Sequence, residues 1–271
     1  MPSIPVFTRS ADGVLLTPGG GSFLYRLRVP LRIPYGAEPV MYLVGGSVWF
    51  TNPNILTGVN DTLYLYFEGL VGSGNEIQTI VFEKGLYSLK TLNEALKEKL
   101  QAAAGGGVFS GDEVVISANS ATQKLTITLA PTAATGTVTV VFDNSSISRF
   151  LGFDGSVTAF AADENSPIKS ITAPLVAKFN SLSYFIVHVD GLCSGVLGSR
   201  GSDAGSELAI ITPENIAAGK QIVVQPYNVV RVPCKAAGAS ISEFTVRLTD
   251  QNGADVDLLG EEFSIQFVIE W

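Results

Sequence analysis

The alternation of apolar and polar positions predicts a chain built mainly of short β-strands. Between residues 23 and 29, Tyr25 and Leu27 fall on one face and Arg26 and Arg28 on the other, as in a half-buried strand. Similar runs follow, separated by Gly, Asn, Pro and Ser clusters that favour turns. They predict strands at residues 40–44, 47–50, 62–67, 77–82, 113–117, 124–129, 137–142, 183–189, 207–211, 221–225, 242–248 and 262–269. We expect antiparallel sheets.

One stretch near the middle of the chain has helical periodicity. Its leucines share one helical face; they are Leu89, Leu92, Leu96 and Leu100. Either Ser88 or Thr91 can cap the start, and Thr91-x-x-Glu94 fits a capping box, while the glycines at 105–107 end the helix. With the hairpin 113–117/124–129, the strand 137–142 and a helical turn over 147–153, this segment predicts a small α+β unit.

Strands before and after this unit predict an all-β fold, an antiparallel β-sandwich of jelly-roll type. We expect the jelly-roll domain at residues 23–85 and 156–271 and the inserted α+β subdomain at 86–155. Residues 1–22, which are rich in Pro and Gly, predict an extended arm. The Gly- and Ser-rich segment 190–206 predicts a long exposed loop.

Composition narrows the classes of function. The chain has 271 residues, of which 46% are hydrophobic and 15% charged, and a net charge of −8. An acidic chain without a Lys or Arg run is expected not to bind nucleic acid directly. Mean hydropathy is +0.32, but residues such as Pro53 and Gly58 break the uncharged stretch 39–60, so we expect no membrane span. The apolar surplus instead favours subunit interfaces.

The first residues, MPSIPVFTRSADG, carry neither the basic segment nor the long apolar segment of a signal peptide. We therefore expect synthesis and folding in a cytosol-like compartment.

Residues that often carry chemistry are scarce, and we expect no catalytic, cofactor-binding or metal-binding residue. His188 is the only histidine and lies in an apolar strand, so a structural role is favoured. Cys193 and Cys234 fit no CxxC pattern; two buried thiols and a disulfide formed later remain alternatives. The acidic loop near Asp250 could supply calcium ligands, but Gly253 is misplaced for an EF-hand and a solvated hairpin is favoured.

Several segments, in order, carry a resemblance to a protein family. They are SVWFTNPNI at 47–55, GLYSL at 85–89, LNEAL at 92–96, FLGF at 150–153, LTDQNGADVD at 248–257 and GEEFSI at 260–265. Over about two thirds of the chain this order resembles the jelly-roll penton or minor capsid proteins of polinton-like viruses, adintoviruses and virophages.

The resemblance implies a structural protein in the capsid of a double-stranded DNA virus, located in the virion, without catalytic residue or cofactor. It implies a penton or minor capsid subunit that assembles with itself, as a pentamer or alternatively a trimer. Neighbouring major and minor capsid proteins are the other implied partners.

Two other functions remain open. A virion spike or receptor-binding protein would use the loop 190–206 and the α+β insertion as an outward tip. A β-sandwich carbohydrate-active enzyme would need a cleft lined by converging carboxylates, whereas the adjacent Glu261 and Glu262 point to opposite faces of a strand. A cellular adhesin or cytokine-like jelly roll is disfavoured by the missing secretion signal.

Overall fold

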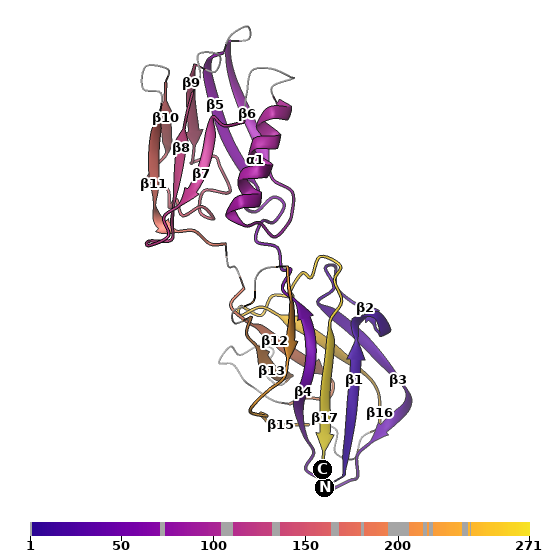
Figure 1. Cartoon of the computed structure of the whole chain (residues 1–271). Helices are drawn as coiled ribbons and strands as arrows, with labels where there is room; N and C mark the ends of the chain where they lie inside the picture. The colour runs from indigo at the N-terminus through magenta and orange to yellow at the C-terminus, as the bar shows by residue number, and fades with distance from the viewer. Residues whose placement is uncertain are drawn as a thin grey trace. The chain divides into compact units, whose positions relative to one another are not determined.

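The computed structural model divides the chain into two compact units, each with its own hydrophobic core (Figure 1). The first unit comprises Met1–Asn52 and Leu182–Trp271, and the second comprises Pro53–Ser181. The structure describes residues 2–70, 74–103, 111–131, 136–163, 168–179, 182–194, 206–213, 216, 219–234, 238 and 240–271.

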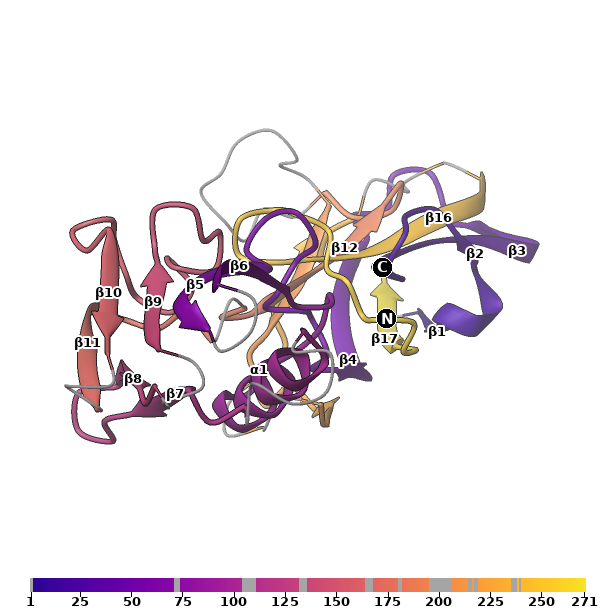
Figure 2. The same ribbon diagram turned by 90° about the horizontal axis from the view of Figure 1, so that it is seen from above.

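The first unit contains two antiparallel sheets, which form separate layers in Figure 2. One sheet has the order β1-β17-β4-β14, with β15 also paired to β4, and the other has the order β13-β12-β16-β3-β2. The strands are β1 (Ser3–Arg9), β2 (Val14–Leu15), β3 (Ser22–Arg32), β4 (Val40–Trp49), β12 (Phe185–Asp190), β13 (Glu207–Ile211), β14 (Gln221–Val224), β15 (Val232–Pro233), β16 (Ser240–Thr249) and β17 (Ser264–Glu270).

The strand order identifies the architecture as a jelly roll. If the two-residue strands β2 and β15 are set aside, the described strands of this unit number eight. Counted along the chain, they form one sheet in the order 1-8-3-6 and another in the order 5-4-7-2. This pairing of the first strand with the last, and of the second with the seventh, is the jelly-roll order. The expected mainly antiparallel jelly-roll fold is therefore confirmed.

The core of the jelly roll follows from the two-residue period of its strands. In β17, Ile265, Phe267 and Ile269 are fully buried and alternate with less buried residues. They pack in one cluster with residues of the opposite sheet, such as Val187 and Val246. The first unit is thus a sandwich closed around a single apolar layer.

Residues 40–44 and 47–50, expected as two strands, form the single strand β4. The two glycines between them do not turn the chain. A Cβ atom at Gly46 would lie 2.4 Å from the carbonyl oxygen of Ser264, so only glycine allows β17 to approach so closely. The register shifts next to this pair, because Gln266 lies opposite Gly45 and Phe267 lies opposite Leu43, which leaves Val44 as the extra residue of a β-bulge in β4.

The N-terminal segment also differs from its expected form as an extended arm. All of β1 pairs with β17, from Ser3 opposite Glu270 to Arg9 opposite Ser264. The inward side chains of Ile4 and Val6 pack on the core, and the Thr8 hydroxyl donates to the carbonyl oxygen of Ile265 at 3.0 Å. The segment is therefore an integral strand of the jelly roll.

The second unit consists of two further antiparallel sheets and the one α-helix in the described residues. The sheets have the orders β10-β9-β5-β6 and β11-β8-β7. The elements are β5 (Thr62–Leu70), β6 (Gly74–Val81), α1 (Leu89–Ala103), β7 (Val114–Ala118), β8 (Lys124–Leu129), β9 (Thr137–Val141), β10 (Ala159–Ala162) and β11 (Lys169–Val176). Figure 1 shows α1 beside β6 and β7, so the helix contacts an end strand of each sheet.

A serine hydroxyl caps the start of helix α1, because it accepts a hydrogen bond from a free amide of the first turn. The Thr91 amide donates to Ser88 Oγ at 3.2 Å, and the Ser88 amide donates to Thr91 Oγ1 at 2.9 Å. This reciprocal pair makes Ser88 the cap and resolves the choice between Ser88 and Thr91. Leu92, Leu96 and Leu100 are fully buried in the core of the second unit. The glycines at 105–107, expected to end the helix, lie outside the described residues.

The boundary between the units differs from the expected one. Residues 53–85 and 156–181 belong to the second unit, because β5 pairs with β6 and β9 rather than with a jelly-roll strand. Likewise, β11 pairs with β8 and β10 with β9. The inserted unit therefore spans residues 53–181 and connects β4 to β12, the third and fourth strands of the jelly roll.

Candidate interaction surfaces of the jelly-roll unit

His188 is buried, with an exposed fraction of 3%, but it alternates with the core residues Val187 and Val189 and so lies on the opposite face of β12. Its Nδ1 lies 3.1 Å from the hydroxyl of Ser206 and its Nε2 lies 2.9 Å from the hydroxyl of Thr249. The ring therefore links β12 to Ser206, which directly precedes β13, and to Thr249 at the end of β16. This is the arrangement of a structural histidine.

Cys193 and Cys234 are far apart in sequence but are antiparallel partners in an isolated bridge. Both side chains are buried thiols, and Cys193 Sγ donates to the carbonyl oxygen of Glu207 at 3.2 Å. Of the two alternatives left open by the sequence, the structure therefore has the buried thiols.

The acidic loop after β16 uses its carboxylates within the loop. Asp250 Oδ1 accepts from the amides of Asn252 and Ala254 at 2.8 and 2.9 Å. Asp255 Oδ1 lies 3.7 Å from an Arg247 nitrogen. Within the part of the chain that the structure describes, no three His, Cys, Asp or Glu side chains converge on a possible metal position. The geometry is that of a hydrogen-bonded turn.

The remaining candidates from the sequence lie apart from one another. Glu261 and Glu262 are both exposed at the entrance to β17. Most of the expected loop at 190–206 falls on residues 195–205, which lie outside the described residues. No described helix is long and apolar enough to cross a membrane.

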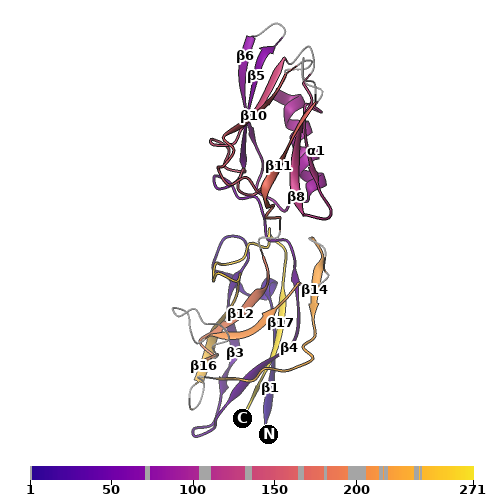
Figure 3. The same ribbon diagram turned by 90° about the vertical axis from the view of Figure 1, so that its left-hand side faces the viewer.

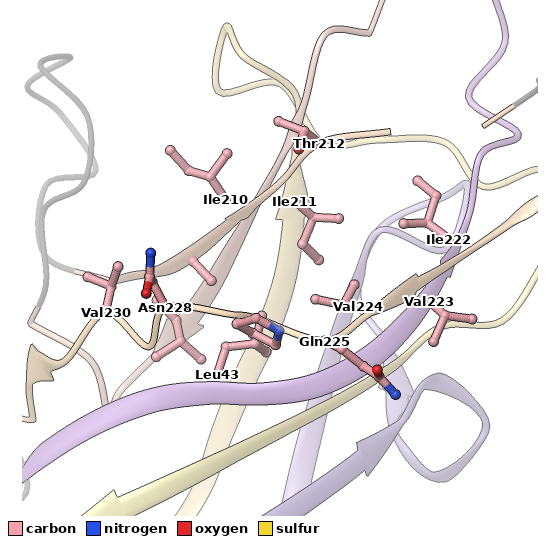
Figure 4. A pocket seen from close by; sticks show the side chains of 13 residues that line it. Leu43, Ile210, Ile211, Thr212, Ile222, Val223, Val224, Gln225, Asn228 and Val230 are labelled. Carbon is pink, nitrogen blue, oxygen red and sulfur yellow. The ribbon is translucent and has the colours of Figure 1, made fainter. Parts of the chain in front are cut away.

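An apolar groove lies between the two sheets at one side of the jelly roll. Its volume is about 400 Å³, and the strands β13 and β14 form its walls. Figure 4 shows Ile211 of β13 and Val224 of β14 facing each other across it, with Leu43 of β4 nearby. The described residues that line it are Leu43, Leu208, Ala209, Ile210, Ile211, Thr212, Ile222, Val223, Val224, Gln225, Pro226, Asn228 and Val230, none of them charged.

The two walls of this groove are the last strands of their sheets. Among the described strands, β13 pairs only with β12, and β14 pairs only with β4; Figure 3 shows β14 at the margin of its unit. The rim carries exposed apolar side chains, including Ile210, Val223 and Val230, and the neighbouring Tyr227 is fully exposed. Exposed apolar surface of this kind marks an interaction site.

The sequence did not identify this groove. Only the uncharged run VVQPYNVV at residues 223–230 gave a local signal. The other wall, β13, follows a connection of 16 residues after β12, so the juxtaposition depends on pairing that no local pattern encodes.

The chain matches solved structures in fold but has no match at the level of sequence families. No family model matches it, and no curated protein matches it. It is similar to the mavirus penton protein, with 13% identity and a TM-score of 0.51 over 99% of each chain. A structure of the Sputnik virophage also matches, with 13% identity and a TM-score of 0.44 over 99% of this chain and 98% of the other.

The likeness to the mavirus penton protein extends over both units, because 99% of this chain is covered. At 13% identity, what the two chains share is the fold: a jelly roll with a large insertion. The fold expected from the family resemblance is therefore confirmed.

Proposed function

We propose that this protein is a structural subunit of a virus capsid, a penton or minor capsid protein located in the virion. The observation that carries the proposal is the match in fold, over 99% of both chains, to the mavirus penton protein. A shared jelly roll alone would be weak support, because many functions use that fold. The match over the inserted unit as well makes the support more specific.

The surface of the jelly-roll unit supports the same function. A lone soluble domain exposes apolar residues singly, whereas here they gather around an apolar groove at the edge of both sheets. Burial of such surface between repeated subunits stabilises a closed ring, because every copy makes the same contact. We propose self-assembly, with five copies favoured and three as the alternative, and contacts with neighbouring major and minor capsid proteins.

We propose no catalytic activity. An enzyme of this fold would need convergent reactive side chains in a cleft. The groove between β13 and β14 is lined by uncharged side chains, and His188 is enclosed between two hydroxyl groups. A spike or receptor-binding function is not favoured by any described feature of this chain.

Native mass spectrometry of the purified chain of 271 residues tests the proposal. One chain has a mass of 28.6 kDa, so a ring of five gives a discrete species of five times that mass, and a ring of three gives three times. Either discrete species supports assembly and fixes the symmetry. A monomer that persists at about 100 μM, well above the dissociation constant of a stable interface, contradicts the proposal.

A further inference from the structure

The jelly roll has two flanks, and the strand order sets them on opposite sides. One sheet runs from β1 to β14 and the other from β2 to β13. Since β1 and β2 follow each other along the chain and β13 and β14 line one groove, one flank is formed by β1 and β2 and the other by β13 and β14. Figure 1 shows β2 and β13 on opposite sides of this unit.

The β1/β2 flank carries protruding apolar side chains. About half of each side chain is exposed in Phe7, Val14, Leu15 and Leu16. The two charged residues within the segment 7–16 pair with each other, because Arg9 Nε lies 3.1 Å from Asp12 Oδ2. Among the described strands, β1 pairs only with β17 and β2 only with β3, so nothing described covers this flank.

The β13/β14 flank carries the apolar groove. It is hollowed by the groove of about 400 Å³, whose described lining contains no charged side chain. Ile210, Val223 and Val230 are exposed along it. An apolar protrusion fits such a groove without leaving a charge buried and unpaired.

We propose that the β1/β2 flank of one copy packs into the β13/β14 groove of the next copy, with Leu15 and its neighbours against Ile210 and Val223. This interface rests on the proposed function, because it assumes that the chain assembles with itself. A second copy is the occupant that the observations favour: a closed ring larger than a dimer needs two different, mutually fitting patches on each subunit, one for the preceding copy and one for the next. The protrusion and the groove meet that requirement on one chain.

A pair of charge substitutions tests this interface. Leu15→Glu introduces a charge into the protruding flank, and Ile210→Glu introduces one into the groove. Both residues are about half exposed, at 54% and 46%, so the free subunit accommodates the charge. In the interface the charge is buried without a partner. The dissociation constant of the assembly should therefore be at least about 30-fold higher in each variant than in the wild type. Ile77→Glu is the matched control, since Ile77 is an exposed strand residue of the inserted unit, at 67%.

Mixing the two variants gives the sharper result. Leu15→Glu keeps an intact groove and Ile210→Glu keeps an intact protrusion, so an equimolar mixture should form a dimer with one copy of each and no larger ring. Native mass spectrometry resolves that dimer if one variant is isotopically labelled. Far-ultraviolet circular dichroism and thermal melting confirm that each variant is folded.

The outcomes separate this inference from the proposed function. Rings that persist in both variants, or a mixture that stays monomeric, overturn the assignment of the flanks while leaving self-assembly intact. Loss of the ring in Ile77→Glu, with retention in Leu15→Glu, places the interface on the inserted unit instead. A wild-type chain that is itself monomeric overturns both the interface and the proposed function.

Discussion

Asn54 joins the two ends of the inserted unit, and its replacement gives a sharp prediction. Its side-chain Nδ2 donates to the carbonyl oxygens of Tyr87 and Phe179 at 2.7 and 3.0 Å, and its Oδ1 accepts from the Tyr87 amide at 2.8 Å. The residue is 4% exposed. One buried side chain thus connects the entry to the unit, the start of α1 and the exit from the unit.

Replacement of Asn54 by Leu keeps the size of the side chain but removes all three hydrogen bonds. A hydrogen bond contributes about 1 kcal/mol net, and a buried group left without its partner costs somewhat more. We therefore expect the free energy of local unfolding of the inserted unit to fall by roughly 3 kcal/mol. A fall of that size corresponds to opening that is about 100-fold more frequent.

Hydrogen exchange followed by mass spectrometry on the full chain measures this change. Peptides from residues 53–181 should exchange about 100-fold faster, under conditions in which the exchange rate reports the opening equilibrium. Peptides from residues 182–271 should keep their rates, because that unit has a separate core. Asn119→Ala is the control: its side chain accepts two exposed hydrogen bonds in a turn of the same unit, so the change should stay below about 1 kcal/mol.

Asn54 does not stabilise the inserted unit in this way if Asn54→Leu changes the exchange of that unit no more than Asn119→Ala does. Equal acceleration of both units would also contradict the prediction, because the two cores would then unfold as one cooperative body.

Three further predictions concern stability. Burial raises the pKa of the Tyr25 phenol above its ordinary value of 10.0. As the pH rises, the unfolded chain therefore loses this proton before the folded chain does, and the free energy of unfolding should fall above about pH 10. Denaturant titrations should show a less steep fall in Tyr25→Phe. The hydrogen bond from the Gly58 amide, at 2.7 Å, lowers the pKa of Asp61. Asp61→Asn should therefore be less stable than wild type at neutral pH, and urea titrations should show the difference vanishing as the pH falls below about 4, through the lowered pKa. Gly152 has φ +93°, and a Cβ there would lie 2.4 Å from the carbonyl oxygen of Leu175; Gly152→Ala should lower the melting temperature, with a destabilisation of about 1–3 kcal/mol or more.

Local features of the fold could be predicted where the signal lies within a few residues. The leucines of α1 repeat at helical spacing, and Leu92, Leu96 and Leu100 are all fully buried. The turn expected at 147–153 forms as well, with the Phe153 amide donating to the carbonyl oxygen of Ser148 around Gly152. Periodicity and glycine placement suffice for such elements because their hydrogen bonds are local.

The errors arise where pairing partners lie far apart in sequence. In β1, the alternation of Ile4, Val6 and Thr8 was present, but Pro5 and the glycines that follow concealed it. Its partner in β17 lies more than 250 residues away. The unit boundary was misplaced for the same reason: β5 has the pattern of a jelly-roll strand, and only its pairing with β9 assigns it to the inserted unit.

The groove has a similar origin, and this explains why function was harder to localise than fold. Its walls β13 and β14 are consecutive in sequence yet belong to different sheets, so their juxtaposition follows from the jelly-roll order rather than from any motif. The apolar surplus in the composition indicated that some surface is covered by a partner. Composition does not show where on the molecule that surface lies, however. The order of the strands does, because it places one flank on each side of the jelly roll.

The position of the insertion within the jelly roll bears on how such a subunit can assemble. The inserted unit interrupts the connection between β4 and β12, and both strands are internal: β4 lies between β17 and β14, and β12 lies between β13 and β16. The four flank strands β1, β2, β13 and β14 are joined only to other jelly-roll elements. An insertion at this connection therefore adds a second unit with its own core without interrupting either flank. A jelly roll that binds its copies through the flanks, as we propose for this chain, can therefore carry a second unit and keep that interface.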